Sequence, residues 1–128
     1  MTVTVNLVES ALTTEAPTPC NPTGFFDKSE LDTYYQNRSR LSGHVSHYVP
    51  GVDLSTGSLG HGLSSGVGMA YALKKKNNDA KVYVVLGDGE CDEGSVWEAM
   101  LFANHYSLDN IVAIVDHNKM QSMDFCEK

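Results

Sequence analysis

An aspartate and an asparagine each follow a short apolar run, and together they could hold a divalent cation. Asp88 comes directly after KVYVVLG, and Asn118 follows IVAIVDH. Both runs are short and rich in β-branched residues, which is typical of buried parallel strands. Ligands bind outside the carboxyl ends of such strands, and neighbouring strands lie about 4.8 Å apart, so both side chains can reach one ion. A carboxylate, an amide oxygen and a backbone carbonyl favour magnesium or calcium, with diphosphate oxygens and water completing about six positions.

Two glycines flank the aspartate and would let a phosphate come close to the backbone. A side chain at Gly87 or Gly89 would obstruct the approach of a phosphate to backbone N–H groups. We expect Gly89 to be the donor, because its amide precedes the start of the next helix. The formal net charge of -7 agrees with this, since a diphosphate at an acidic site needs a cation to offset repulsion. Taken alone, Asp88 or Asn118 would more often be a turn residue than a metal ligand.

The elements around these residues form a strand, helix, strand unit. We predict strands in KVYVVLGDG and IVAIVDHN and a helix in EGSVWEAMLFANHY, with Val96, Met100 and Ala103 on its inner side. A further helix is predicted over residues 60–76, whose glycine-rich first half requires the close approach of another backbone or a ligand. A strand, helix, strand unit joins two parallel strands by a right-handed crossover, so the fold class is α/β.

The segment before this unit divides into a tail, a short helix and a loop. Residues 1–23 are interpreted as a tail or linker because of their prolines, and residues 24–128 as the domain. Within FFDKSELDTYYQN, Asp27 or Ser29 can cap a short helix that places Leu31 and Tyr34 or Tyr35 on one face. The stretch RSRLSGHVSHYVPGVDLSTGSLGHG has no sustained period, which predicts a long irregular loop, and such loops are usually functional.

Taken together, these motifs resemble the thiamine diphosphate signature of transketolases. GDGECDEGSVWEA followed by VDHNKMQS resembles their diphosphate- and metal-binding part, and GHVSHYVPGVDLSTGSLGHGLSSGVGMA resembles their cofactor loop. The resemblance covers residues 24–128 and implies a partial thiamine diphosphate-binding fold with parallel strands and crossover helices. It is greatest to the N-terminal subunit of transketolases whose two halves are separate chains.

The resemblance implies which residues hold the metal and the diphosphate. Asp88 and Asn118 would coordinate magnesium together with the backbone carbonyl of Met120. Gly87 would leave room for the diphosphate, and Gly89 would donate its N–H to it.

The resemblance also implies roles for the long loop and for a second acid. His44 would contact a phosphoryl oxygen or the reacting centre, while Gly57 and Leu59 would line the pocket around the cofactor rings. Glu93 matches a buried acid near the subunit interface that couples paired active sites. His61 stands where many relatives carry glutamine, so the resemblance assigns it no role.

The implied activity is the transfer of a two-carbon ketol unit from a ketose to an aldose, with sugar phosphates as substrates. The cofactor supplies the electron sink, while the protein positions it. The resemblance offers no counterpart of the family's upstream catalytic histidines in residues 1–23, and none of the pyrimidine-binding domain with its activating glutamate in residues 24–128. A complete active site is therefore not expected from these residues alone: the chain is a fragment, a degenerate copy or one member of a multi-chain enzyme. In the last case we expect a homo- or hetero-oligomer with a pyrimidine-binding chain. An incomplete sheet is also expected to expose edge strands and apolar faces.

Two other functions stay open. One is that the chain is a non-catalytic remnant or binding module of the same fold. The other, suggested by GSLGHG at the start of a helix, is a nicotinamide dinucleotide-binding module. The acidic charge argues against nucleic acid, and no apolar run is long enough for a bilayer. His44, His47 and His61 are not expected to bind zinc, because nothing fixes them on one face. Three widely spaced cysteines without a secretory signal favour reduced thiols in the cytoplasm.

Overall fold

The structure is a computed structural model that describes residues 2–6, 26–117, 119–121 and 124–125. Its centre is a parallel sheet in the order β1 (Thr2–Asn6), β2 (Lys81–Gly87) and β3 (Ile111–Asp116). The register pairs Val82 with Ile111 and Gly87 with Asp116, so β2 and β3 end side by side. The two strands predicted from apolar, β-branched runs are confirmed.

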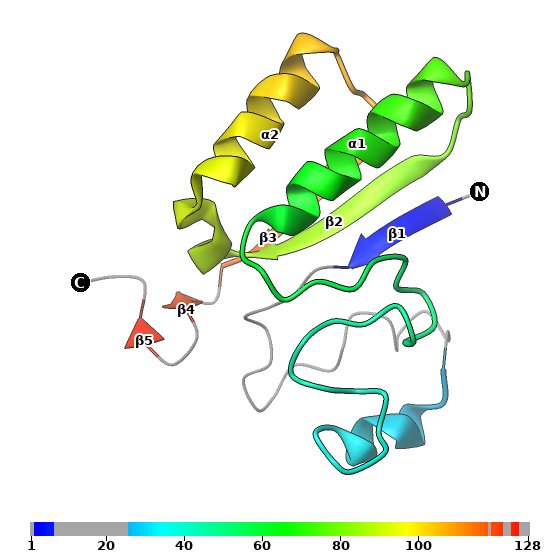
Figure 1. Cartoon of the computed structure of the whole chain (residues 1–128), viewed down its shortest axis with the longest axis vertical. Helices are drawn as coiled ribbons and strands as arrows, with labels where there is room; N and C mark the ends of the chain where they lie inside the picture. Colours follow the sequence, from blue (N-terminus) through cyan, green and yellow to red (C-terminus); the bar gives the residue numbers. More distant parts are fainter. Residues whose placement is uncertain (1, 7–25, 118, 122–123, 126–128) are drawn as a thin grey trace.

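Two helices cover one face of the sheet (Figure 1). α1 (His61–Lys75) precedes β2, and α2 (Gly94–His105) connects β2 to β3. Because the chain moves across the sheet in one direction, two right-handed crossovers place both helices on the same side. Both predicted helices and the α/β class are confirmed.

The core lies between these helices and β2. Its buried side chains are Leu63, Val67 and Ala70 of α1, Val82, Val84 and Leu86 of β2, and Val96 and Ala99 of α2. A Cβ atom at Gly66 would lie 2.5 Å from Cγ2 of Val84, so α1 needs glycine there to approach the strand. The expectation that Met100 faces inward is wrong, because Ala99 is buried and Met100 is 37% exposed.

The first strand lies within the segment that the sequence predicts to be a tail or linker. Thr2–Asn6 pairs in parallel with β2, with Thr2 opposite Lys81 and Asn6 opposite Val85. The alternating threonines and valines of this segment are β-branched and suit a strand. Residues 7–23 lie outside the described residues, and the domain boundary at residue 24 remains a prediction.

The segment before α1 forms a smaller cluster below the sheet in Figure 1. It begins with the 3-10 helix η2 (Lys28–Thr33), whose first turn is capped by Asp27 as the sequence suggests. Leu31 and Tyr34 pack against the buried loop residues Leu41, Val49 and Val52. The loop that follows is irregular, as predicted, apart from an antiparallel bridge between Val45 and Thr56.

The face of the sheet opposite the helices is more open. Val112 and Ile114 of β3 are opposite Tyr83 and Val85 of β2, and Ile114 is 49% exposed. Two short antiparallel strands, β4 (Met120–Gln121) and β5 (Asp124–Phe125), follow β3. None of the helices in the described part of the chain is long and apolar enough to cross a membrane.

Candidate functional site

The carboxyl ends of the strands, the starts of both long helices and a short 3-10 helix meet at one end of the molecule (Figure 1). The 3-10 helix η3 (Asp88–Asp92) follows β2 directly and leads into α2. Gly87 lies opposite Asp116, so the residues that follow β2 and β3 leave the sheet at the same edge. This is the edge at which parallel α/β sheets bind ligands.

Asp88 faces the turn that follows β3. Its Oδ2 atom accepts a hydrogen bond of 2.8 Å from the backbone N–H of Lys119 and lies 3.7 Å from Nε2 of His117. Its Oδ1 atom accepts from the backbone N–H of Gly89 at 3.1 Å. Asn118 itself lies outside the described residues, but the residues on both sides of it contact Asp88. The patterns of the sequence did not predict that His117 lies beside Asp88.

A buried acid that the sequence patterns do not predict lies at this end of the sheet. Glu90 is 2% exposed and lies on η3. Its Oε2 atom accepts from the N–H of Gly60, and its Oε1 atom accepts from the N–H of Gly87, both at 3.0 Å. Glu90 therefore joins the start of α1 to the end of β2. The available signal was an acid three residues after the glycine that begins a helical turn, as in a capping box.

Glu93 differs from the acid that the resemblance implies. It precedes α2, and its backbone N–H donates to the carbonyl of Glu90 at 3.0 Å. Its side chain is exposed in this chain, so the buried acid among the described residues is Glu90. Any burial of Glu93 requires atoms from outside the described residues.

The long loop brings two of the expected cofactor residues together. The ring of His44 packs over Gly57, where a Cβ atom would lie 3.2 Å from both Cγ and Nδ1 of the ring. His44 is exposed on the wall of a cavity of about 430 Å³ that Tyr35 also lines. Leu59 is half-buried and lies next to Gly60, so the bond from Gly60 to Glu90 connects this loop to the end of β2.

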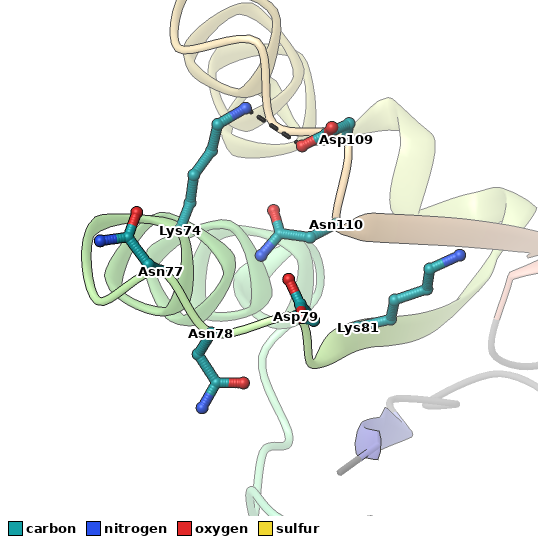
Figure 2. Close-up of a pocket in the computed structure, with 7 residues that line it drawn as sticks. All are labelled: Lys74, Asn77, Asn78, Asp79, Lys81, Asp109 and Asn110. Carbon is teal, nitrogen blue, oxygen red and sulfur yellow. Dashed lines mark hydrogen bonds and ion pairs between the residues drawn. The ribbon is translucent and has the colours of Figure 1, made fainter.

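The opposite end of the sheet carries a cleft of similar size, about 420 Å³. Figure 2 shows that Lys74 from α1 reaches Asp109, while Asn110 lies between these residues and Asp79. The Lys74 Nζ to Asp109 Oδ1 distance is 3.1 Å, and both side chains are exposed. None of the site residues predicted from the sequence lines this cleft.

Comparison with known proteins found a family model that matches most of the chain. The family described as "Transketolase, thiamine diphosphate binding domain" matches residues 23–124. The chain belongs to the transketolase family. Its fold is accordingly part of the α/β thiamine diphosphate-binding fold, in the N-terminal domain of transketolases.

Relatives within the transketolase family include proteins named as separate subunits. The chain is 52% identical over 98 residues to an apulose-4-phosphate transketolase subunit of Phocaeicola vulgatus, a match covering 77% of this chain and 35% of the relative. It is 50% identical over 103 residues to the protein of the same name in Actinobacillus succinogenes, covering 80% of this chain and 37% of the relative. The chain therefore spans little more than a third of these relatives.

A solved transketolase has the same fold. The transketolase from Leishmania mexicana superposes with a TM-score of 0.70 at 27% identity, covering 91% of this chain and 19% of that protein. The similarity to this transketolase extends over nearly all of the chain.

The negative charges at the carboxyl end of the sheet suit a bound cation and a protonated Cys91 thiol. Burial raises the pKa of the Cys91 thiol, and the negative charges of Glu90, Asp88 and Asp92 act in the same direction. Cys91 consequently stays protonated near neutral pH and is a poor nucleophile. An anionic diphosphate placed among these carboxylates would require a counter-cation, and carboxylate oxygens such as those of Asp88 are hard ligands of the kind that magnesium prefers.

Proposed function

We propose that the chain binds the diphosphate of thiamine diphosphate through Mg²⁺, as part of a transketolase that moves a two-carbon ketol unit from a ketose to an aldose. The observation that carries the proposal is the contact of Asp88 with the turn after β3, since its carboxylate accepts the N–H of Lys119 at 2.8 Å. A carboxylate has about four lone-pair positions, so it can accept backbone N–H groups and ligate a metal ion at the same time. In the proposal, Asn118 and the carbonyl of Met120 complete the protein ligands.

The other site residues bind and orient the cofactor. When bound, thiamine diphosphate supplies the carbanion and the electron sink for transfer of the two-carbon unit. Gly87 gives the backbone clearance that a phosphate needs, and the N–H of Gly89 exchanges its bond to Asp88 for one to the diphosphate. His44 contacts a phosphoryl oxygen or the reacting centre, and Gly57 and Leu59 line the pocket around the rings.

We further propose that the chain acts with a pyrimidine-binding chain in the cytoplasm, on sugar phosphates. Two similar relatives are named as subunits of a transketolase, which supports a divided enzyme. The exposed side chain of Glu93, at the start of α2, is available to a partner at this end of the sheet. In this proposal, Glu93 couples paired active sites across the interface.

The central test is the substitution Asp88→Ala. We expect a loss of affinity for thiamine diphosphate with Mg²⁺ of about 100-fold or more, because a metal ligand is removed. Calorimetry should be performed on the chain alone and mixed with a pyrimidine-binding chain, with circular dichroism to confirm an intact fold. Asp92→Ala is the matched control, since Asp92 is an exposed carboxylate on the same short helix. Undiminished affinity in Asp88→Ala contradicts the proposal.

The same experiments separate the two alternative functions. A dinucleotide-binding turn needs a strand directly before it, but residues 46–55 are turns and irregular backbone. NADH is therefore expected not to bind. Ketol transfer that appears only when both chains are mixed supports a divided enzyme, whereas a mixture that binds the cofactor without turnover identifies a non-catalytic remnant.

A further inference from the structure

The geometry points to Glu90 as a positioning residue that holds two cofactor-binding segments of the proposed site in register. One segment is the loop that leads through Gly57 and Leu59 into α1, and the other is the end of β2 before Asp88. The inference rests on the proposed function, because it concerns the placement of residues assigned to thiamine diphosphate. Glu90 touches neither the metal nor the cofactor in this scheme.

Both oxygens of the carboxylate have a backbone partner from a different segment. Gly60, from the turn before α1, donates to Oε2, and Gly87, the last residue of β2, donates to Oε1. Glu90 is 2% exposed, so water is poorly placed to replace it at either N–H group. The two segments therefore share one buried acceptor.

Residues at the start of α2 also restrict the backbone of Gly60, from the side that does not face Glu90. Its φ angle is +77°, and a Cβ atom there would lie 2.5 Å from Oγ of Ser95 and 3.0 Å from Cβ of Glu93. The backbone of Gly60 is thus held between the start of α2 and the carboxylate of Glu90. A change at Glu90 must move this turn or leave its N–H without a buried acceptor.

The two N–H donors are close in sequence to the residues that would touch the cofactor. Gly60 follows Leu59 directly, and Gly87 precedes Asp88 directly. A displacement of either donor therefore has to pass through only one peptide unit to reach Leu59 or Asp88. This is the role of groups that orient metal ligands without binding the metal, and their loss typically weakens binding about 10- to 100-fold.

The test is the substitution Glu90→Gln, with Asp92→Asn as the matched control. Glutamine keeps the length of the side chain but turns one acceptor oxygen into an amide NH₂, which cannot accept from an N–H group. Asp92 undergoes the same change of chemistry on the same short helix, where it is exposed. Binding of thiamine diphosphate with Mg²⁺ is measured by calorimetry, alone and with a pyrimidine-binding chain. Amide exchange at Gly60 and Gly87 is measured by NMR without cofactor.

We expect Glu90→Gln to bind the cofactor about 10- to 100-fold more weakly and to exchange at least one of the two amides faster, while Asp92→Asn matches the wild type. Equal affinity in Glu90→Gln overturns the inference and leaves the proposed function standing. Weaker binding with unchanged exchange at both amides also overturns it, since the segments would not then depend on Glu90. A wild-type chain that binds no cofactor in either setting refutes the proposed function, and the inference with it.

Discussion

The two ends of the parallel sheet each carry a group of charged side chains, but they use those charges differently. At the carboxyl end, the carboxylates of Asp88 and Glu90 accept backbone N–H groups from separate segments. At the amino end, Lys74 and Asp109 pair with each other at 3.1 Å, with side chains that are 41% and 86% exposed. Lys74 also donates to the carbonyl of Ser107, just after α2.

Cleft size alone does not separate the amino end of the sheet from the loop that carries His44. The amino-end cleft and the cavity beside His44 have similar volumes, about 420 and 430 Å³. The charges of the amino-end cleft hold a helix end and a turn at the surface. Those of the carboxyl end hold the segments that the cofactor would contact, so changes there should affect both stability and binding.

The largest effect on stability is expected from Glu90→Ala. It leaves the buried N–H groups of Gly60 and Gly87 without this acceptor, and each such group costs about 1 to 3 kcal/mol. We expect the free energy of unfolding to fall by about 2 to 6 kcal/mol, measured by urea denaturation. Asp92→Ala, on the same short helix, should leave the urea midpoint nearly unchanged. Equal midpoints for the two variants would remove the distinction between buried and exposed acids at this end.

The sequence alone predicted the elements around Asp88 well. Strong patterns of apolar residues placed α1, α2, β2 and β3 within a few residues of their ends in the structure. The order of strand, helix and strand also fixed the edge at which Asp88 would lie. These predictions succeeded because crossover geometry is a property of the backbone and depends little on individual side chains.

The failures concern features that depend on packing between distant segments. Met100 and Ala99 are neighbours in α2, and the apolar pattern could not decide which of them the core admits. Glu90 looks like an ordinary acid in the first turn of a helix, because its partner Gly60 lies far away in the sequence. The prolines of residues 1–23 predict a tail or linker, whereas the strand Thr2–Asn6 depends on pairing with β2, which is distant in the sequence.

A smaller effect is expected at the amino end from Asn110→Ala. Its Nδ2 group donates to the carbonyl of Ala70 at 2.9 Å, but its buried Oδ1 atom has no hydrogen-bond partner in the described part of the chain. The substitution removes one favourable bond together with one unsatisfied acceptor. We expect a loss of about 1 kcal/mol in the free energy of unfolding, measured in the same urea series. A loss as large as that of Glu90→Ala would show that both ends are equally critical.

The smallest effect on stability is expected from Lys74→Met, which tests the surface pair directly. The hydrogen bond from Lys74 is the main cause that lowers the pKa of Asp109 below its usual value of 3.8. Because the pKa is depressed in the folded chain, the stabilisation by this pair is present above pH 3.8 and is lost as the pH falls through the folded pKa. In Lys74→Met, the pKa of Asp109 should rise toward its usual value, as measured by NMR titration.

The control for this titration is Lys76→Met, which removes an exposed lysine two residues further along the same helix end. It should leave the pKa of Asp109 close to that of the wild type, and added salt should weaken the effect of Lys74 because both partners are exposed. Cofactor binding should be unchanged in both lysine variants, since neither residue lies at the carboxyl end of the sheet. If Lys74→Met weakened cofactor binding as strongly as Glu90→Gln is expected to, the two ends would be coupled, and the assignment of separate roles to them would be wrong.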